Sequence, residues 1–134
     1  MPAPLNIQRV HHVARVTNRP EESKAFYRDV LGFRAIQRPP FHFRGAWLYN
    51  YGVQIHIIEN PEMAETAPKR IDTLGNHLAL EVEDVDVAKE RLREHGIDFF
   101  EQVNAGGIHQ VFFLDPDGHI LEIAVYGPTP PEVS

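Results

Sequence analysis

The amino-acid sequence predicts an α+β fold built from two similar modules, each with the order strand, helix, strand and hairpin. An internal repeat carries this prediction, because HVARVTNRPEESKAFYRDVLGFRAI and AWLYNYGVQIHII are followed by HLALEVEDVDVAKERLREHGIDFF and QVFFLDPDGHILEIAV. The glycines repeat with it, since Gly32 and Gly96 lie 64 positions apart and Gly52 and Gly118 lie 66 apart. Two such modules are expected to pack around a pseudo-twofold axis.

The first module is expected at about residues 7–60, with its helix after the first strand. Asn18 suits the N-cap position, and Pro20 lies in the first turn, where its missing N–H is tolerated. Phe26 and Val30 form an apolar pair four residues apart, and Gly32 ends the helix.

The second module is expected at about residues 75–127, and residues 128–134 read as an extended, proline-rich tail of a single domain spanning 1–134. Asp84 can cap the second helix. Val85, Ala88 and Leu92 then fall on one helical stripe before Gly96 ends the helix.

Composition excludes several function classes. The 13 basic and 19 acidic residues give a net charge of −6, which disfavours binding to nucleic acid or to an anionic membrane and leaves a small molecule as the expected partner. There is no cysteine, so any metal site must use His, Asp or Glu. No signal-peptide pattern and no run of about 20 apolar residues is present, so a cytoplasmic location is expected.

Ligand-type residues occur at equivalent positions of the two modules. His56 stands inside the strand-like run QIHIIE, where it shares a face with Gln54 and Ile58. The repeat places His56 on Glu122 and His12 on His77. Four such residues at related positions favour a metal site, and the alternative is a set of structural polar residues.

The motifs VHHVARV, FYRDVLGF, NHLAL, HGI and FFLDPDGHILEI resemble those of the vicinal oxygen chelate superfamily, which includes glyoxalase I, fosfomycin-resistance enzymes, methylmalonyl-CoA epimerase and extradiol dioxygenases. The resemblance covers nearly the whole chain. DPDGHILEI is its most specific part, because it joins a turn to a strand that bears a glutamate. The stretch RPPFHFRGAWLYNYGVQIHIIE is most similar to the glyoxalase-like branch.

This resemblance implies two βαβββ modules that form a curved mixed sheet around a metal-containing cavity, and a homodimer. It implies one divalent ion, Zn, Ni, Co, Mn or Fe, held by His12, His56, His77 and Glu122. His12 takes the first position because HHVAR aligns with NHLAL through it, with His11 as the alternative. His56 departs from the family pattern, since bacterial glyoxalase I usually has glutamate there.

The implied activity is that of a lyase or isomerase of the glyoxalase type. The ion would act as a Lewis acid on two adjacent substrate oxygens, with Glu122 or His56 moving the proton. Two alternatives remain. Without His56 the other three ligands form a two-histidine, one-carboxylate set suited to an Fe(II) extradiol-type dioxygenase. A metal-free protein of the bleomycin-resistance type would instead bind a small molecule.

Four further residues are candidates for a substrate pocket. Trp47, Tyr49 and Tyr51 occupy every second position and are expected to share one face, either at the mouth of an aromatic pocket or in core packing and at a subunit interface. Arg15 could meet a carboxylate or phosphate, or form a surface ion pair. His109 follows a glycine-containing loop and could line the cavity entrance.

Overall fold

The computed structural model describes residues 1–63 and 70–134. The chain divides into two compact units, residues 1–64 and 65–134, which we call the first and second modules. The predicted segments at about 7–60 and 75–127 fall within these units.

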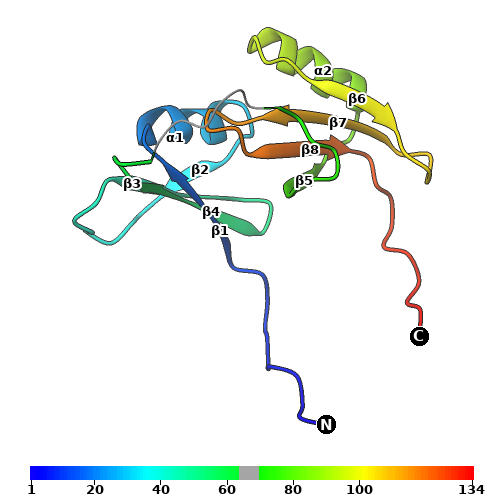
Figure 1. Ribbon diagram of the computed structural model, residues 1–134, viewed down its shortest axis with the longest axis horizontal. Helices are drawn as coiled ribbons and strands as arrows, with labels where there is room; N and C mark the ends of the chain where they lie inside the picture. The colour runs from blue at the N-terminus through cyan, green and yellow to red at the C-terminus, as the bar shows by residue number, and fades with distance from the viewer. Residues whose placement is uncertain (64–69) are drawn as a thin grey trace. The chain divides into compact units, whose positions relative to one another are not determined.

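The first module is a four-stranded mixed sheet with one helix (Figure 1). The strand order is β1-β4-β3-β2, with β1 parallel to β4 and the other neighbours antiparallel. Its elements are β1 (His12–Thr17), α1 (Pro20–Asp29), β2 (Arg34–Ile36), β3 (Gly45–Asn50) and β4 (Val53–Glu59).

The second module repeats this topology, with the strand order β5-β8-β7-β6 and β5 parallel to β8. The prediction of an α+β fold with two βαβββ modules is therefore confirmed. The elements are β5 (His77–Glu81), α2 (Val85–Glu94), β6 (Phe100–Val103), β7 (His109–Leu114) and β8 (Ile120–Ala124).

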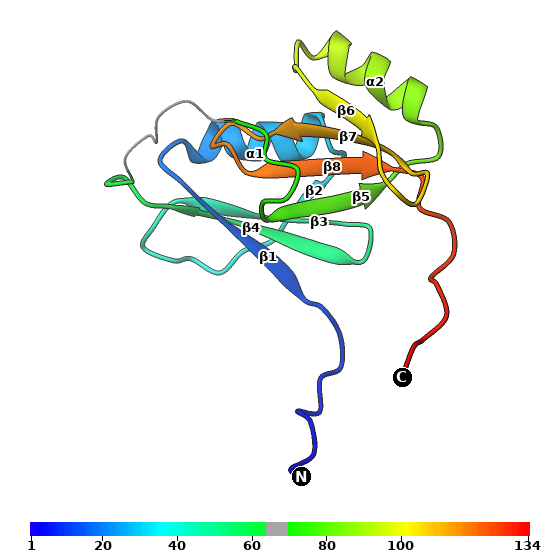
Figure 2. The same ribbon diagram turned by 45° about the vertical axis from the view of Figure 1, so that its right-hand side comes forward.

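Each helix packs on one face of its own sheet, α1 against β3 and β4 and α2 against β7 (Figure 2). In the first module, Leu48, Ile55 and Ile57 lie on the covered face and are fully buried or nearly so. Their strand neighbours point to the opposite face, because side chains alternate along a strand. The first sheet therefore has one apolar face under α1, and the alternate side chains of its strands project from the other face.

The two helices begin differently from each other. Asp84 caps α2 as predicted, because its carboxylate accepts hydrogen bonds from the backbone N–H groups of Asp86 and Val87. The prediction that Asn18 caps α1 is wrong. Arg19 holds the N-cap position without a side-chain hydrogen bond, and the Asn18 amide donates instead to the carbonyl of Met63.

The β3–β4 hairpin corrects a second prediction. Its turn residues Tyr51 and Gly52 have φ values of 54° and 77°, and a two-residue hairpin turn of this kind needs positive φ at both positions. Tyr51 therefore leaves the strand alternation and does not share the face of Trp47 and Tyr49. Its hydroxyl donates to the Leu31 carbonyl at 2.6 Å.

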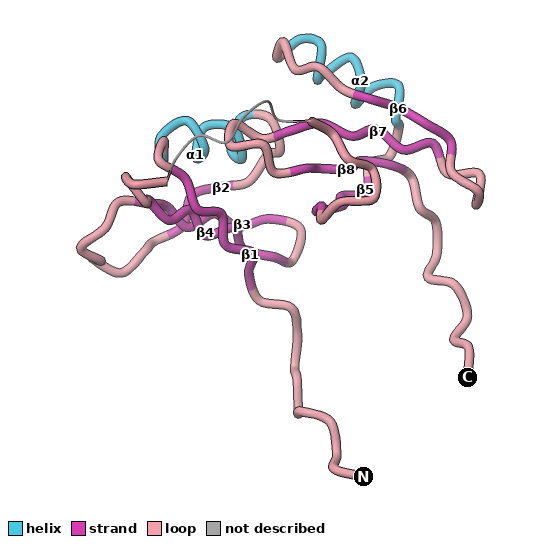
Figure 3. The backbone as a smooth tube through the Cα atoms, in the orientation of Figure 1, coloured by secondary structure: helices cyan, strands magenta, loops and turns pink. Residues whose placement is uncertain are grey.

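The chain segments before β1 and after β8 are loops (Figure 3). The helices α1 and α2 have ten residues each. That corresponds to about 15 Å, half the thickness of a bilayer core. Within residues 1–63 and 70–134, no helix reaches the length and hydropathy that crossing a membrane requires.

Candidate functional site

The uncovered face of the first module gathers histidines and an aromatic residue from three adjacent strands. His12 of β1 is paired with Gln54 of β4, and Trp47 of β3 is paired with His56 of β4. Paired residues project to the same side of a sheet. All four side chains therefore lie opposite the face that α1 covers.

Three of these side chains form a continuous stack. The imidazoles of His12 and His56 are 3.9 Å apart between ring centroids, with 10° between their planes. The indole of Trp47 stacks on the other side of His56 at 4.2 Å and 6°. His56 is consequently buried, with 7% of its surface exposed, although it lies on the face without a helix.

Hydrogen bonding selects which nitrogen of His56 can bind a ligand. Its Nε2 lies 2.8 Å from the Gln54 carbonyl oxygen, which can only accept, so Nε2 carries the proton. In the neutral ring the lone pair is then on Nδ1. Burial lowers the pKa of His56, and electrostatic repulsion from the neighbouring His12 and His11 lowers it further, which favours the neutral ring that metals bind.

Neighbouring contacts also constrain His12. Its Nδ1 lies 2.9 Å from Nδ1 of His11, so one of these two nitrogens must donate a hydrogen to the other. An imidazole binds a metal through a lone pair in the plane of its ring. Because the rings of His12 and His56 are nearly parallel and 3.9 Å apart, one of them must rotate before both can bind the same ion.

The second module brings His77 of β5 and Glu122 of β8 together. Nε2 of His77 lies 3.4 Å from Oε1 of Glu122, and Nδ1 of His77 donates to the Gly75 carbonyl at 2.8 Å. Because Nδ1 carries the hydrogen of this bond, the lone pair of the neutral ring is on Nε2, the nitrogen that lies near Glu122. Two ligand atoms that each lie about 2.1 Å from one ion are about 3.0–3.4 Å apart, so this pair fits a metal site.

The carboxylate of Glu122 is buried, with 3% of the residue exposed, and both of its oxygens accept hydrogen bonds. Gln110 donates to Oε1 at 2.9 Å, and the Tyr126 hydroxyl donates to Oε2 at 2.5 Å. Gln102 extends the network by donating to the Gln110 carbonyl oxygen at 3.0 Å. Glu122 is thus held in one orientation.

Sequence reasoning missed Tyr126, which lies beyond β8 next to the segment read as a tail. Burial raises the pKa of Tyr126, and so do its hydrogen bond to Glu122 and the negative charges of Glu122 and Glu81. Its hydroxyl therefore stays protonated and remains a donor to the carboxylate. The available signal was its spacing, because Tyr126 is four residues from Glu122, an even number, and follows closely after the end of β8.

The strand registers bear directly on the choice between His11 and His12. His12 is opposite Gln54, two residues before His56, and His77 is opposite Ile120, two residues before Glu122. His12 and His77 are therefore equivalent in the repeat, whereas His11 precedes β1.

Two of the predicted pocket residues lie on other faces. Arg15 pairs with Ile57, and its Nε donates to the Tyr27 hydroxyl of α1 at 3.0 Å, so it is on the helix-covered side. Along β7 the side that faces Glu122 carries Gln110 and Phe112, so His109 projects to the opposite side.

The other two pocket candidates, Trp47 and Tyr49, lie on the face of the first sheet that α1 does not cover. Tyr49 pairs with Gln54 and is 40% exposed, beside Trp47. His109, by contrast, lies on the side of the second sheet away from Glu122, where its Nε2 is 2.9 Å from a carboxylate oxygen of Glu101. The aromatic pair is thus next to the histidines of the first module, whereas Arg15 and His109 are engaged elsewhere.

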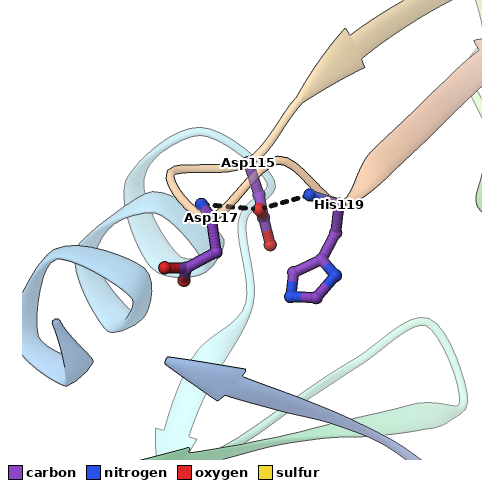
Figure 4. A group of neighbouring side chains, drawn as sticks. All are labelled: Asp115, Asp117 and His119. Carbon is purple, nitrogen blue, oxygen red and sulfur yellow. Dashed lines mark hydrogen bonds between the residues drawn. The ribbon is translucent and has the colours of Figure 1, made fainter. Parts of the chain in front are cut away.

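A second group of ligand-type side chains occurs in the β7–β8 turn, where ligand atoms of Asp115, Asp117 and His119 lie within 4.8 Å of one another (Figure 4). One oxygen of Asp115 accepts hydrogen bonds from the backbone N–H groups of Asp117 and His119, both at 2.9 Å. Asp115 therefore closes the turn, which accounts for its burial.

Comparison with known proteins agrees with the fold. The family model described as the Glyoxalase/Bleomycin resistance protein/Dioxygenase superfamily matches residues 9–123. Glyoxylase I 4 of Arabidopsis thaliana is 40% identical over 126 residues, covering 90% of this chain and 72% of that protein.

Solved structures of other proteins have a similar fold. The glyoxalase family protein from Enterococcus faecalis has a TM-score of 0.69 and 30% identity, covering 87% of this chain and 97% of that one. A glyoxalase/dioxygenase from Nostoc punctiforme has a TM-score of 0.74 and 23% identity, covering 96% and 97% of the two chains, and this similarity concerns the fold alone.

Proposed function

Because this chain belongs to the glyoxalase/bleomycin resistance protein/dioxygenase superfamily, we propose that it is a divalent-metal-dependent lyase or isomerase of the glyoxalase type. The observation that carries the proposal is the pairing of Nε2 of His77 with Oε1 of Glu122 at 3.4 Å. A buried carboxylate oxygen near Nε2 of an imidazole whose Nδ1 is hydrogen-bonded to a backbone carbonyl matches a pair of metal ligands with an oriented histidine.

The proposed ligands of one Zn, Ni, Co, Mn or Fe ion are His12, His56, His77 and Glu122. Their donor atoms, three imidazole nitrogens and a carboxylate oxygen, suit any of these metals. When bound, the ion supplies a Lewis acid for two adjacent oxygens of a small substrate.

The chain's own residues supply proton transfer and shape. Glu122 is the proposed base, since each carboxylate oxygen has two lone pairs and Oε2 can accept the Tyr126 hydrogen bond and still take a proton. His56 is the second group able to take a proton, at Nδ1, when that nitrogen is displaced from the ion. Trp47 and Tyr49 are proposed to shield the substrate from water beside these histidines.

A second candidate function is supported by the contacts of His56. Its Nε2 is bound to Gln54 and its ring is stacked on both sides, which leaves His12, His77 and Glu122 as a set without it. Two histidines and one carboxylate favour Fe(II) and oxygen chemistry of the extradiol type. A small-molecule binding role without metal is the third possibility.

We further propose that the protein acts as a homodimer in the cytoplasm on a small-molecule substrate. Its net charge of −6 supports a partner other than nucleic acid.

Metal analysis of the untagged protein by mass spectrometry, beside His56→Ala and Glu122→Ala, tests these candidates. Loss of about one divalent ion per chain in both variants supports the four-ligand lyase or isomerase. Iron retained by His56→Ala supports the dioxygenase. A wild-type protein that binds no Ni, Zn, Mn or Fe(II) would contradict both and leave the binding protein.

A further inference from the structure

Tyr126 is tied to the second module at two points. Its hydroxyl donates to Oε2 of Glu122, and its backbone N–H donates to Oε2 of Glu81 at 2.7 Å. The same oxygen of Glu81 accepts from the N–H of Gly127 at 3.1 Å, where φ is +76°. Glu81 therefore fixes the backbone that carries Tyr126, and the Tyr126 hydroxyl fixes the carboxylate of Glu122.

The two oxygens of Glu122 have different surroundings as a result. Oε1 faces Nε2 of His77 and accepts from Gln110. Oε2 lies on the other side of the carboxyl group and accepts from Tyr126. Hydrogen bonds from a neutral hydroxyl to a carboxylate are short and strongly directional, so this contact opposes rotation of the carboxyl group.

We propose that Tyr126 is a positioning residue that assigns the two oxygens of Glu122 separate tasks, with Oε1 directed to the ion and Oε2 kept for the proton. This inference rests on the proposed function, because it assumes that Glu122 is a ligand. Without the Tyr126 hydroxyl, Oε2 loses its donor in a buried site, and binding the ion through both oxygens becomes the favourable way to satisfy it.

Glu81 acts through Tyr126, because none of the hydrogen bonds of the described residues joins Glu81 to Glu122. Removing its charge loosens residues 126 and 127 without changing the ligands. The losses of metal affinity caused by Tyr126→Phe and by Glu81→Gln should therefore not add, because the two residues belong to one hydrogen-bonded network.

The test is a Co²⁺ titration of the metal-free full chain, followed by the visible absorption of the bound ion, whose intensity reports its coordination number. Tyr126→Phe is expected to change the spectrum, because the second oxygen of Glu122 would then also contact Co²⁺. It is also expected to weaken Co²⁺ binding by roughly 10-fold or more, because the carboxylate is no longer held in the orientation for binding. Glu81→Gln should change the spectrum in the same direction. The double variant should bind Co²⁺ no more weakly than Tyr126→Phe alone.

Tyr51→Phe is the matched control, because it also removes one hydroxyl with a hydrogen bond, the one to the Leu31 carbonyl in the first module. Its Co²⁺ affinity and spectrum should equal those of the wild type. Equal affinity and spectrum in wild type and Tyr126→Phe would overturn the positioning role and leave the proposed function standing. A wild type that does not bind Co²⁺ would overturn both.

Discussion

The imidazole of His12 lies face to face with that of His56, with ring centroids 3.9 Å apart and 10° between the ring planes. Trp47 continues the stack on the far side of His56 at 4.2 Å. Because a bound ion lies in the plane of each imidazole, this stack must open before both histidines bind one ion. The residues that hold His56 in place should therefore influence metal binding.

Gln54→Ala tests that relation. It removes the oxygen that holds the proton on Nε2 of His56, so the ring loses its fixed tautomer and orientation. We expect metal affinity to fall by about 10- to 100-fold, measured by isothermal titration calorimetry with Zn²⁺. Gln8→Ala, at an exposed residue before β1, is the control and should have no effect. Unchanged affinity in Gln54→Ala would argue that His56 is not a ligand.

Gln110→Ala removes the donor to Oε1 of Glu122 and leaves a buried carboxylate with one protein partner fewer. The expected loss of unfolding free energy in the metal-free protein is about 1–3 kcal/mol, measured by urea denaturation. Gln102→Ala is the comparison, because it removes only the outer hydrogen bond of the network. Equal stability of the two variants would show that the Gln110 contact contributes little.

Gly45→Ala should destabilise the first module, because an added Cβ would lie 2.1 Å from the Ile57 carbonyl oxygen of β4. Backbone on both sides must then move, at an expected cost of about 1–3 kcal/mol in thermal or urea unfolding. Gly106→Ala provides the control, since its closest neighbour is a side-chain oxygen of Asn104 at 3.3 Å. A stable Gly45→Ala protein would contradict the close approach of β3 and β4 at this point.

The pH dependence of stability can be tested at Glu59, whose side chain accepts hydrogen bonds from Arg44. That hydrogen bond, together with the charge of Arg44, lowers the pKa of Glu59 below its ordinary value of 4.5. The carboxylate thus stabilises the fold above pH 4.5, and this contribution is lost as the pH falls through the lowered pKa.

Arg44→Gln should raise the pKa of Glu59 toward its ordinary value, as followed by NMR titration of the side-chain carboxyl group. Arg28→Gln serves as the control, because Arg28 pairs with Asp29 at the end of α1 instead. The same pKa for Glu59 in both variants would argue against the Arg44 contact.

Much of the fold could be predicted because its signals are local. Apolar alternation, helical stripes and turn glycines recur in both halves, and they gave the two βαβββ modules. The errors were also local. Asn18 was a reasonable N-cap by residue type, but it bonds to Met63, which is far away in sequence. Tyr51 continued the alternation of β3 only until the hairpin turn required positive φ.

Less of the candidate site than of the fold could be predicted from the sequence. Alternation from His12 already places Arg15 on the other face of β1, so its position could have been anticipated. The face of His109 relative to Glu122 depends on the β7–β8 register, and this follows from tertiary pairing. Tyr126 reaches Glu122 from a segment with no strand or helix pattern of its own.

The sequence by itself determined the repeat, the order of the elements and the equivalence of His12 with His77 and of His56 with Glu122, because periodicity and spacing are properties of neighbouring residues. The tertiary structure decided what each ligand-type side chain contacts. It placed His56 between the rings of His12 and Trp47. It also gave each carboxylate oxygen of Glu122 a hydrogen-bond donor. Such contacts join residues on different strands, and their geometry exists only once the strands have paired in register.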